Sequence, residues 1–300
     1  MINPYRDISG EWVRGSFHGH SDEYSTCGSV PLLTGADQYQ QVGAGFMAVT
    51  DHNHVTDLTE CRTRYPHMIF LPGFEHSHGH DMLFIGENAG AVLDLSIDRA
   101  LDAADALLTV VCHPDPRGDG SYWTLDLLRE LGRSPDGIEI FNGHYGVERL
   151  RKLGCWPCFT HFWDAALTEG FHVWGYANDD FHDPADFNNA YNMVNVDNLT
   201  AEALIDAAKC GRCYGSTGLH LVAFHGKNGT ITIEVDADCE GRFVGPGGHV
   251  LATSRGHYFT YSLCDEAYVR FEGSGKTGRI FLQPIFAGAE RHQTNIEKTS

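Results

Sequence analysis

Six short segments of this 300-residue chain place imidazole or carboxylate side chains where an apolar run stops. The segments are 17–20, 49–53, 72–75, 79–80, 112–114 and 180–182, and they carry His18, His20, His52, Glu75, His80, His113, Asp180 and His182. Histidine, glutamate and aspartate are the ligands that borderline or hard divalent metals take from proteins. Because the set exceeds the four ligands of a mononuclear zinc site, the pattern predicts a multinuclear hydrolytic centre.

Composition narrows the class of protein. The formal charge of -19 argues against a nucleic-acid partner, which would need clustered Lys and Arg, and favours a small-molecule substrate. The N-terminus has no apolar signal core, and no later apolar run is long enough for a membrane span. We therefore expect a soluble, cytoplasmic protein without a membrane partner. The nine cysteines are an odd number in a long chain, so the pairs Cys155/Cys158 and Cys210/Cys213 are interpreted as structural.

The elements that must position these side chains alternate between strand and helix up to about residue 215. Short, nearly continuous apolar runs predict buried strands over residues 46–50, 69–71, 82–85, 109–112, 137–141 and 173–176. Helices are predicted over residues 34–42, 96–108 and 200–211. This alternation indicates an α/β barrel or a doubly wound sheet. The barrel is favoured because His52, Glu75, His113 and Asp180 each follow a predicted strand, and barrel strand ends converge on one face.

After about residue 215 the pattern changes to a period of two. Residues 230–235, 258–263 and 268–272 alternate, residues 279–282 close the series, and Gly-rich turns at 245–248 and 273–275 separate them. Half-buried antiparallel strands show this alternation. The sequence therefore predicts two domains, residues 1–215 as the metal-binding barrel and residues 216–300 as a small antiparallel β-sandwich. His220, His225, His249 and His257 are scattered, so this module is expected to lack catalytic side chains and to shape the site mouth or mediate homo-oligomerisation.

The ordered motifs resemble a known superfamily. His-x-His, Thr-Asp-His-Asn, Pro-Gly-x-Glu, a downstream His, His-Pro and Asp-x-His, together with residues 137–143, are similar to the polymerase-and-histidinol-phosphatase (PHP) metallohydrolases over residues 12 to 190. The segments 211–218 and 269–285 resemble the sandwich of one branch, which contains predicted phosphoesterases and also carbamate and ester hydrolases. The resemblance implies a distorted (β/α)7 barrel with two or three metals at its mouth.

The resemblance also implies a role for each residue. Glu75 would bridge two metals. The remaining ligands of the first metal would be His18, His20 and Asp180, and those of the second metal would be His80 and His113. His52 and His182 match residues that help to bind a third metal. Trinuclear members usually carry Asp or His seven or eight residues after the first His, where this chain has Ser25 and Thr26, with Asp22 and Glu23 offset. We therefore expect two tightly held divalent metals (Mn, Fe or Zn) and a third only at high metal concentration.

Three further residues have two interpretations each. Asp51 would orient His52 or cap the following turn. Arg117 would bind a phosphate or remain a solvated charge in a Pro- and Gly-rich loop. Glu139, on a predicted strand, would pair with a histidine if it points inward and would have no role at the site if it points outward.

The leading prediction is a metal-dependent phosphoesterase that cleaves a small phosphate monoester with a metal-bridging hydroxide. His52, His182 and Arg117 would contact the substrate or protonate the leaving oxygen. The alternative is a carbamate or carboxylic ester hydrolase with the same centre. A third interpretation, a binding module with a degenerate metal site, conflicts with the filled ligand positions.

Overall fold

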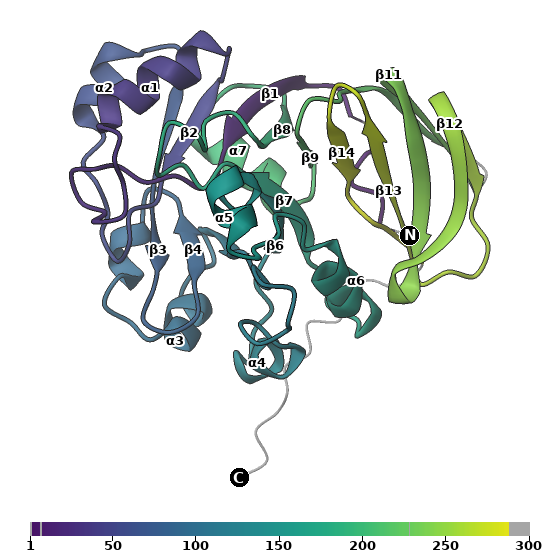
Figure 1. The fold of residues 1–300 in the computed structure, drawn as a ribbon, viewed down its shortest axis with the longest axis horizontal. Helices are drawn as coiled ribbons and strands as arrows, with labels where there is room; N and C mark the ends of the chain where they lie inside the picture. Colours follow the sequence, from purple (N-terminus) through teal and green to yellow (C-terminus); the bar gives the residue numbers. More distant parts are fainter. Residues whose placement is uncertain (1, 7, 228, 288–300) are drawn as a thin grey trace.

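A computed structural model describes residues 2–6, 8–227 and 229–287. The described strands join into one mixed sheet in the order β10-β11-β13-β14-β9-β8-β1-β2-β3-β4-β5-β6-β7, while β12 pairs with β11 and β15 pairs with β13. Figure 1 shows the two ends of this sheet as separate regions, with β1 to β9 on one side and β11 to β14 on the other. In the described part of the chain, no helix has the length and apolar character needed to cross a membrane.

The region that carries the motifs consists of short buried strands. Their bounds are β1 (Glu11–Ser16), β2 (Phe46–Val49), β3 (Ile69–His76), β4 (Met82–Ile85), β5 (Leu108–Val111), β6 (Gly137–Asn142), β7 (Trp174–Asn178), β8 (Tyr191–Val196) and β9 (Cys213–Ser216). β1, β2 and β3 run parallel, as do β5, β6 and β7. β4 is antiparallel to both its neighbours. Its antiparallel pairing with β3 follows from the link between His76 and Met82, which is far too short for a parallel crossover of a dozen residues or more.

Seven α-helices and three short 3-10 turns are found in the described chain, all but η3 among β1 to β9. They are α1 (Leu32–Gln41), α2 (Thr59–Arg64), η1 (Ala89–Val92), α3 (Ile97–Asp102), α4 (Leu125–Glu130), η2 (His144–Gly146), α5 (Glu148–Lys152), α6 (Thr160–Thr168), α7 (Ala201–Lys209) and η3 (Pro246–Gly248). The predicted helix over 96–108 is too long. It ends at Asp102 because the chain then turns, with the amide of Leu107 bonded to the Ala104 carbonyl, and enters β5 at Leu108.

The first and seventh strands meet at one isolated parallel bridge between Gly19 and Phe181, just beyond their carboxyl ends. The amide of His20 donates to the carbonyl of Phe181 there, at 2.9 Å. Within the described residues, β7 forms no ladder with β1 or β8. The observed fold is therefore α/β with a large mixed sheet, and the closed (β/α)7 barrel stays a prediction.

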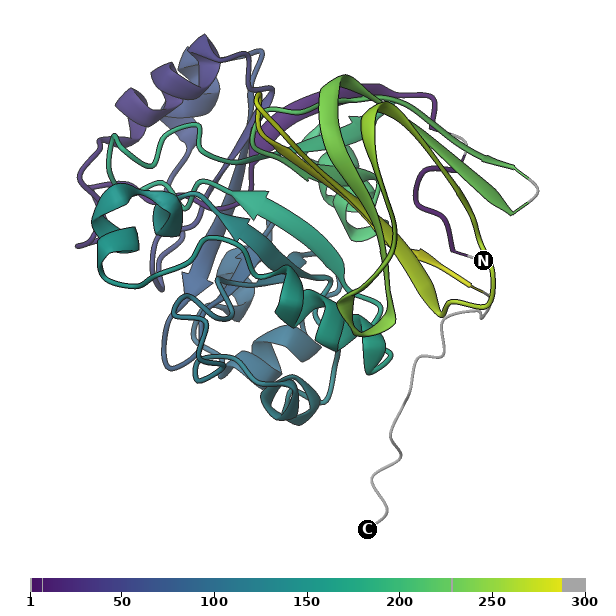
Figure 2. The same cartoon turned by 45° about the vertical axis from the view of Figure 1, so that its right-hand side comes forward.

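The C-terminal strands form an antiparallel module, here called the β module. It comprises β10 (Leu221–Lys227), β11 (Thr230–Gly245), β12 (His249–Ser262), β13 (Tyr268–Gly275), β14 (Arg279–Leu282) and β15 (Ile285–Phe286). Buried residues alternate along the first part of β11, as the period of two predicts. The predicted turn at 273–275 instead lies inside β13, and the chain reverses at Gly278, whose φ is +141°. Figure 2 shows the long strands β11 and β12 curving over this module.

Three features tie the β module to the rest of the chain. β14 pairs with β9, so the sheet continues across residue 215. Tyr5 is buried with the β-module core, so the N-terminal segment packs there as well. The buried guanidinium of Arg270 forms two hydrogen bonds with Asp164 on α6, from Nε to Oδ1 at 2.7 Å and from Nη2 to Oδ2 at 2.6 Å. The proposed division at residue 215 therefore separates regions that share a sheet and a buried ion pair.

Candidate metal centre

The bridge between Gly19 and Phe181 brings two motifs together. In extended chain, successive side chains alternate between faces, so the residues on either side of a paired residue point the same way. His18 and His20 flank Gly19, while Asp180 and His182 flank Phe181. A second isolated bridge places His52 beside Glu75. Local pairing thus explains why a His-x-His and an Asp-x-His motif, separated by about half of the chain, can share one site.

Glu75 is the centre of this arrangement and is only 1% exposed. Its Oε2 atom faces three imidazole nitrogens, those of His18 at 3.5 Å, His20 at 3.3 Å and His52 at 3.0 Å. Its Oε1 atom faces Nε2 of His113 at 3.2 Å. The two oxygens of one carboxylate therefore address two different groups of nitrogen atoms.

Asp180 completes the first group. Its Oδ1 atom lies 3.1 Å from Nε2 of His18 and 3.3 Å from Nε2 of His20, and these two nitrogens are 3.2 Å apart. Although buried, Asp180 Oδ1 has no hydrogen-bond partner of acceptable geometry within the described residues. Converging imidazole lone pairs and an unsatisfied carboxylate oxygen are what a cation would satisfy. The donor set therefore fits a divalent metal.

The second group differs from the prediction at one position. His80 packs its ring against Tyr122 and Trp123 and lies outside the groups of converging ligand atoms found in the described chain. The adjacent Asp81 is grouped with Glu75 and His113 instead, and its Oδ2 atom is 3.7 Å from Nε2 of His113. Among the described residues, Asp81 rather than His80 is therefore the neighbour of Glu75 and His113, and it lies just before β4.

Arg117 is not brought to the site. It is exposed in the loop after His113, where its charge acts on Asp119. Residues 115 to 120 form tight turns, with the amide of Gly120 donating to Oδ1 of Asp115 at 3.0 Å. The loop therefore supports the interpretation of a solvated charge over that of a phosphate anchor.

Glu139 points inward and is completely buried. Its Oε1 atom accepts from Nδ1 of His18 at 3.1 Å, and its Oε2 atom accepts from the amide of His113 at 2.9 Å. Asn142 and Asn178 donate to the same carboxylate. A carboxylate that holds the second nitrogen of a metal-binding imidazole fixes its tautomer and orientation. Asp51 has no comparable contact with an imidazole, since it accepts from Ser21, Ser25 and Thr56 and orders the loop.

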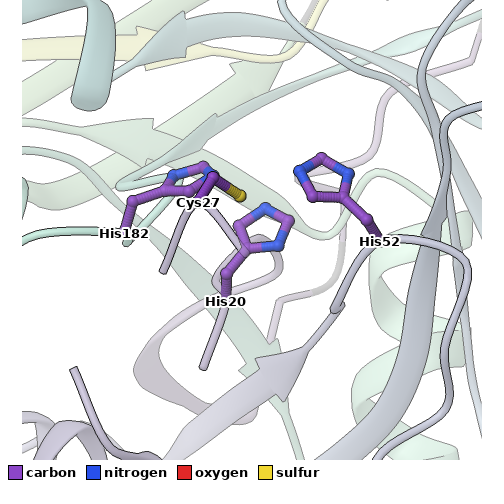
Figure 3. A group of neighbouring side chains, drawn as sticks. All are labelled: His20, Cys27, His52 and His182. Carbon is purple, nitrogen blue, oxygen red and sulfur yellow. The ribbon is translucent and has the colours of Figure 1, made fainter. Parts of the chain in front are cut away.

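A third group contains a residue that sequence reasoning missed. The ligand atoms of His20, Cys27, His52 and His182 all lie within 4.8 Å of one another. Figure 3 shows the sulfur of Cys27 in the space between the three rings. The offset acids do not reach this group: Asp22 is exposed, and Glu23 accepts from the amide of Leu32 at the start of α1. The available signal for Cys27 was its distance in sequence from His18. It lies nine residues after His18, whereas the resembled pattern places an acid or histidine seven or eight residues after the first histidine.

His144 was also missed. Its Nδ1 atom donates to Asp186 at 2.9 Å, and its ring centroid is 4.8 Å from that of His182. The neighbouring Tyr145 places its ring 5.3 Å from that of His113. Both residues follow β6 directly, so their position after a predicted strand was the available signal.

The electrostatics of the site favour cation binding. Burial by itself would lower the pKa of each imidazole, but nearby charges outweigh it. Cys27 and Glu75 raise the pKa of His52 to about 10. Glu75 and Asp180 raise the pKa of His113 to about 9, and Asp180 and Cys27 raise the pKa of His182 to about 9. Without metals the carboxylates therefore hold protons on these rings.

The remaining groups follow the same logic. Burial opposes ionisation of Glu75 and Asp180, yet the charge of His18 and the other rings holds the pKa of both carboxyls well below the usual range. Burial and the charge of His182 lower the pKa of His20 to about 4. Burial would raise the pKa of Cys27, but hydrogen bonds with His182 and His52 lower it to about 6.

Backbone strain also gathers at the site. Among the described non-glycine residues, positive φ occurs at Asn53 (+49°), His113 (+25°), Asp180 (+51°) and Asn188 (+64°). Two of these residues are predicted ligands, and Asn53 follows His52. Left-handed backbone at a non-glycine residue costs free energy and gathers at functional sites, where the surroundings enforce it.

The comparisons with known proteins agree with this fold. No protein-family model and no curated protein sequence matches the chain. Among solved structures, a two-domain protein from Bacteroides vulgatus, described as containing a predicted PHP-like metal-dependent phosphoesterase, superposes with a TM-score of 0.55. The two chains are 16% identical, and the match covers 91% of this chain and 87% of the other. In its fold this protein is therefore similar to the PHP-like two-domain protein, as the motifs predicted.

Two weaker similarities cover a smaller share of this chain than the first one does. A putative metal-dependent phosphoesterase from Bifidobacterium adolescentis is 13% identical, with a TM-score of 0.38, and covers 57% of this chain and 88% of its own. An amidohydrolase from Chromobacterium violaceum is 15% identical, with a TM-score of 0.37, and covers the same shares, 57% and 88%.

Proposed function

We propose that this protein is a metal-dependent hydrolase that acts on a small phosphate monoester. The observation that carries the proposal is the position of Glu75, whose two buried oxygens face different groups of imidazoles. A carboxylate shared by two metals needs this arrangement. The similarity in fold to the Bacteroides vulgatus protein supports the same class of reaction.

The ligand residues divide into two proposed metal positions. The first would be held by His18, His20, Asp180 and Glu75, and the second by Glu75, His113 and Asp81. Such imidazole and carboxylate shells accept Mn, Fe and Zn. Divalent metals supply Lewis acidity there, which lowers the pKa of water and neutralises charge on substrate oxygens.

The chain's own side chains would handle the proton on the leaving oxygen. Asp186 holds Nδ1 of His144, so Nε2 is the atom of that ring left for a substrate. Asp180 similarly engages Nδ1 of His182 through its backbone oxygen at 2.8 Å. A side chain within hydrogen-bond reach of the leaving oxygen can act as a general acid. The ring of His144 lies beside that of His182, so His144 can serve the leaving group even where His182 binds a metal.

A carbamate or carboxylic ester hydrolase remains the second candidate, and one observation favours it. Among the described residues, every ion pair of Glu75 and Asp180 is with an imidazole rather than with Lys or Arg, and Arg117 is exposed. A phosphate would then depend on metals and imidazoles alone for its charge. An ester carbonyl needs less charge neutralisation.

The β module would play no direct part in catalysis in either case. His225, His249 and His257 are exposed, and His220 lies beside the hydroxyl of Tyr191 at 3.2 Å. None of the four belongs to a ligand group in the described chain. We propose that residues 216–300 act as a separate support that shapes the site mouth or forms an oligomer contact.

The test compares three substrates on metal-loaded protein. After loading with Mn, Fe or Zn, para-nitrophenyl phosphate should be hydrolysed faster than para-nitrophenyl acetate or an aryl carbamate. Glu75→Gln should lose both metals and more than about 100-fold in turnover, since even loss of an outer partner of a metal ligand costs about 10–100-fold. Glu130→Gln, on an exposed position of α4, is the matched control and should behave as wild type. Preferred hydrolysis of the acetate or carbamate would select the second candidate, and full metal content in Glu75→Gln would refute the centre.

A further inference from the structure

The chain lacks the acid or imidazole expected seven or eight residues after His18, yet a ligand reaches that place. The backbone from Ser21 to Gly28 makes two successive turns, in which the amide of Ser25 bonds the Ser21 carbonyl at 3.1 Å and that of Gly28 bonds the Ser25 carbonyl at 2.9 Å. A side chain at Gly28 would collide with the Ser21 carbonyl, at 2.5 Å from its Cβ, so the turn needs glycine there. This compact turn carries Cys27, rather than Ser25, to the rings of His52 and His182.

Ser25 itself has become a structural residue. Its hydroxyl donates to Oδ1 of Asp51 at 2.7 Å and lies 3.2 Å from Nδ1 of His20. The amide of His52 donates to the same hydroxyl at 3.3 Å. Ser25 therefore orients the imidazole of His20, holds the backbone of His52 and fixes the loop that presents the thiol.

The four members of the third group cannot all belong to one metal. Nε2 of His20 faces Asp180 and Glu75 at 3.3 Å and so belongs to the first position, while its Nδ1 faces Ser25. That leaves Cys27, His52 and His182. Nδ1 of His52 faces Ser77 at 2.7 Å. Nε2 of His52 is therefore the nitrogen that remains to bind a metal together with Cys27. Three protein ligands leave a coordination position open, as in catalytic rather than structural zinc sites.

We propose that Cys27, His52 and His182 form a third metal position that selects a thiophilic metal, Zn²⁺ over Mn²⁺, and keeps one position open for substrate or water. Thiolate is a soft ligand that favours zinc, whereas carboxylate and water suit manganese. The first two positions contain carboxylates and imidazoles, so the third would differ from them in preference. Cys27 is on the exposed side of the group while His20 is buried, so the open position faces solvent.

Cys112, the other cysteine near the centre, does not compete for this role. It is grouped with His18 and Glu75 rather than with His52 and His182, it is fully buried, and its Sγ faces the carbonyl of Val110 at 3.7 Å.

The inference rests on the proposed metal centre but not on which ester that centre hydrolyses. Metal-free full-length protein is titrated with Co²⁺, whose thiolate bond produces a charge-transfer absorption in the near ultraviolet. Wild type should show the absorption, Cys27→Ser should lose it, and Cys264→Ser, an exposed cysteine of the β module, should keep it. After dialysis with Zn²⁺, Cys27→Ser should also hold one zinc fewer per chain than wild type, with a loss of zinc affinity beyond about 100-fold at that position.

A second variant separates a lost ligand from a damaged fold. Cys27→Asp should restore the missing metal and shift its preference toward Mn²⁺, because a carboxylate replaces the thiolate. Absence of the cobalt absorption in wild type, or full zinc content in Cys27→Ser, would overturn the inference. Failure of the Glu75 centre has a different signature, since Glu75→Gln would then keep the metals of the first two positions.

Discussion

The ligand end of the molecule and the β module both concentrate charge, but they place it in opposite environments. At the ligand end, Glu75, Glu139 and Asp180 are at most 2% exposed. In the β module, charged side chains line an open groove of about 690 Å³, where Glu240 pairs with the exposed Arg242 at 2.6 Å and Arg255 at 3.2 Å. This groove thus lies on a module whose described residues contribute no ligand group.

This difference in burial indicates which group of carboxylates needs a bound cation. Buried carboxylates are costly unless a positive partner compensates them, and at the ligand end the partners are imidazoles that must be protonated to serve. Exposed Arg–Glu pairs are already neutralised and solvated, and each contributes little to stability. Burial without Lys or Arg, rather than the number of acids or the size of the groove, marks the metal site.

The largest effect is expected at the ion pair that joins the two regions, where a substitution tests whether they unfold together. Asp164→Ala leaves the buried guanidinium of Arg270 with only Glu272, at 2.9 Å, as its carboxylate partner. Removing one partner of a buried pair costs about 3–5 kcal/mol, so chemical denaturation should show a loss of that size. Converting both residues, as Asp164→Ala with Arg270→Met, should recover part of it. An unchanged midpoint for the single variant would show that the regions are not coupled through this pair.

A smaller effect is expected at the outer carboxylate of the ligand end. Glu139→Gln keeps the shape of the side chain but removes the negative charge that holds Nδ1 of His18. We expect a loss of about 10–100-fold in affinity for the first metal, measured by competition with a chelator. Asp136→Asn serves as the control and should keep that affinity. Asp136 is the residue just before β6, and its carboxylate faces Thr109 and Lys209 instead of a ligand. Equal affinity in Glu139→Gln and wild type would reduce Glu139 to a packing residue.

The pH dependence of stability should also differ between metal-free and metal-loaded protein. The pKa of His52 is raised to about 10 and those of His113 and His182 to about 9, so their stabilisation is fully present below the unfolded value of about 6.5 and is lost as pH rises through about 9. Thermal unfolding of metal-free protein should therefore shift to lower temperature between pH 6.5 and 9.5. Metals bind the neutral rings, so loading should reverse this trend. Parallel alkaline losses in both forms would contradict it.

The smallest effect is expected in the groove of the β module. Glu240→Ala removes the acid shared by Arg242 and Arg255, but both arginines are exposed to solvent and the side chain of Glu240 is itself 30% exposed. Neither the unfolding midpoint nor the metal content should change measurably. A loss of bound metal in this variant would show that the β module reaches the centre after all.

Much of the site could be predicted from the sequence, because its chemistry resides in residue types next to apolar runs. Glu75, His113 and Asp180 converge as their positions after predicted strands indicated, and His18 and His20 join them after β1, which was not predicted. The strands of β2, β4 and β6 begin at their predicted residues, since continuous apolar runs need burial on both faces. β1, β8 and β9 carry mixed polar residues and were not predicted.

Other features depended on tertiary structure alone. Whether His80 or Asp81 faces the centre depends on how a tight link enters β4, and adjacent residues point to opposite sides. Whether Glu139 points inward depends on the face of β6 that meets His18. Cys27 reaches the site because two consecutive turns shorten the path from Ser21 to Gly28. The sequence by itself determined which donor atoms were present, whereas only the folded chain decided which of them meet, because side-chain direction depends on strand register and turn geometry.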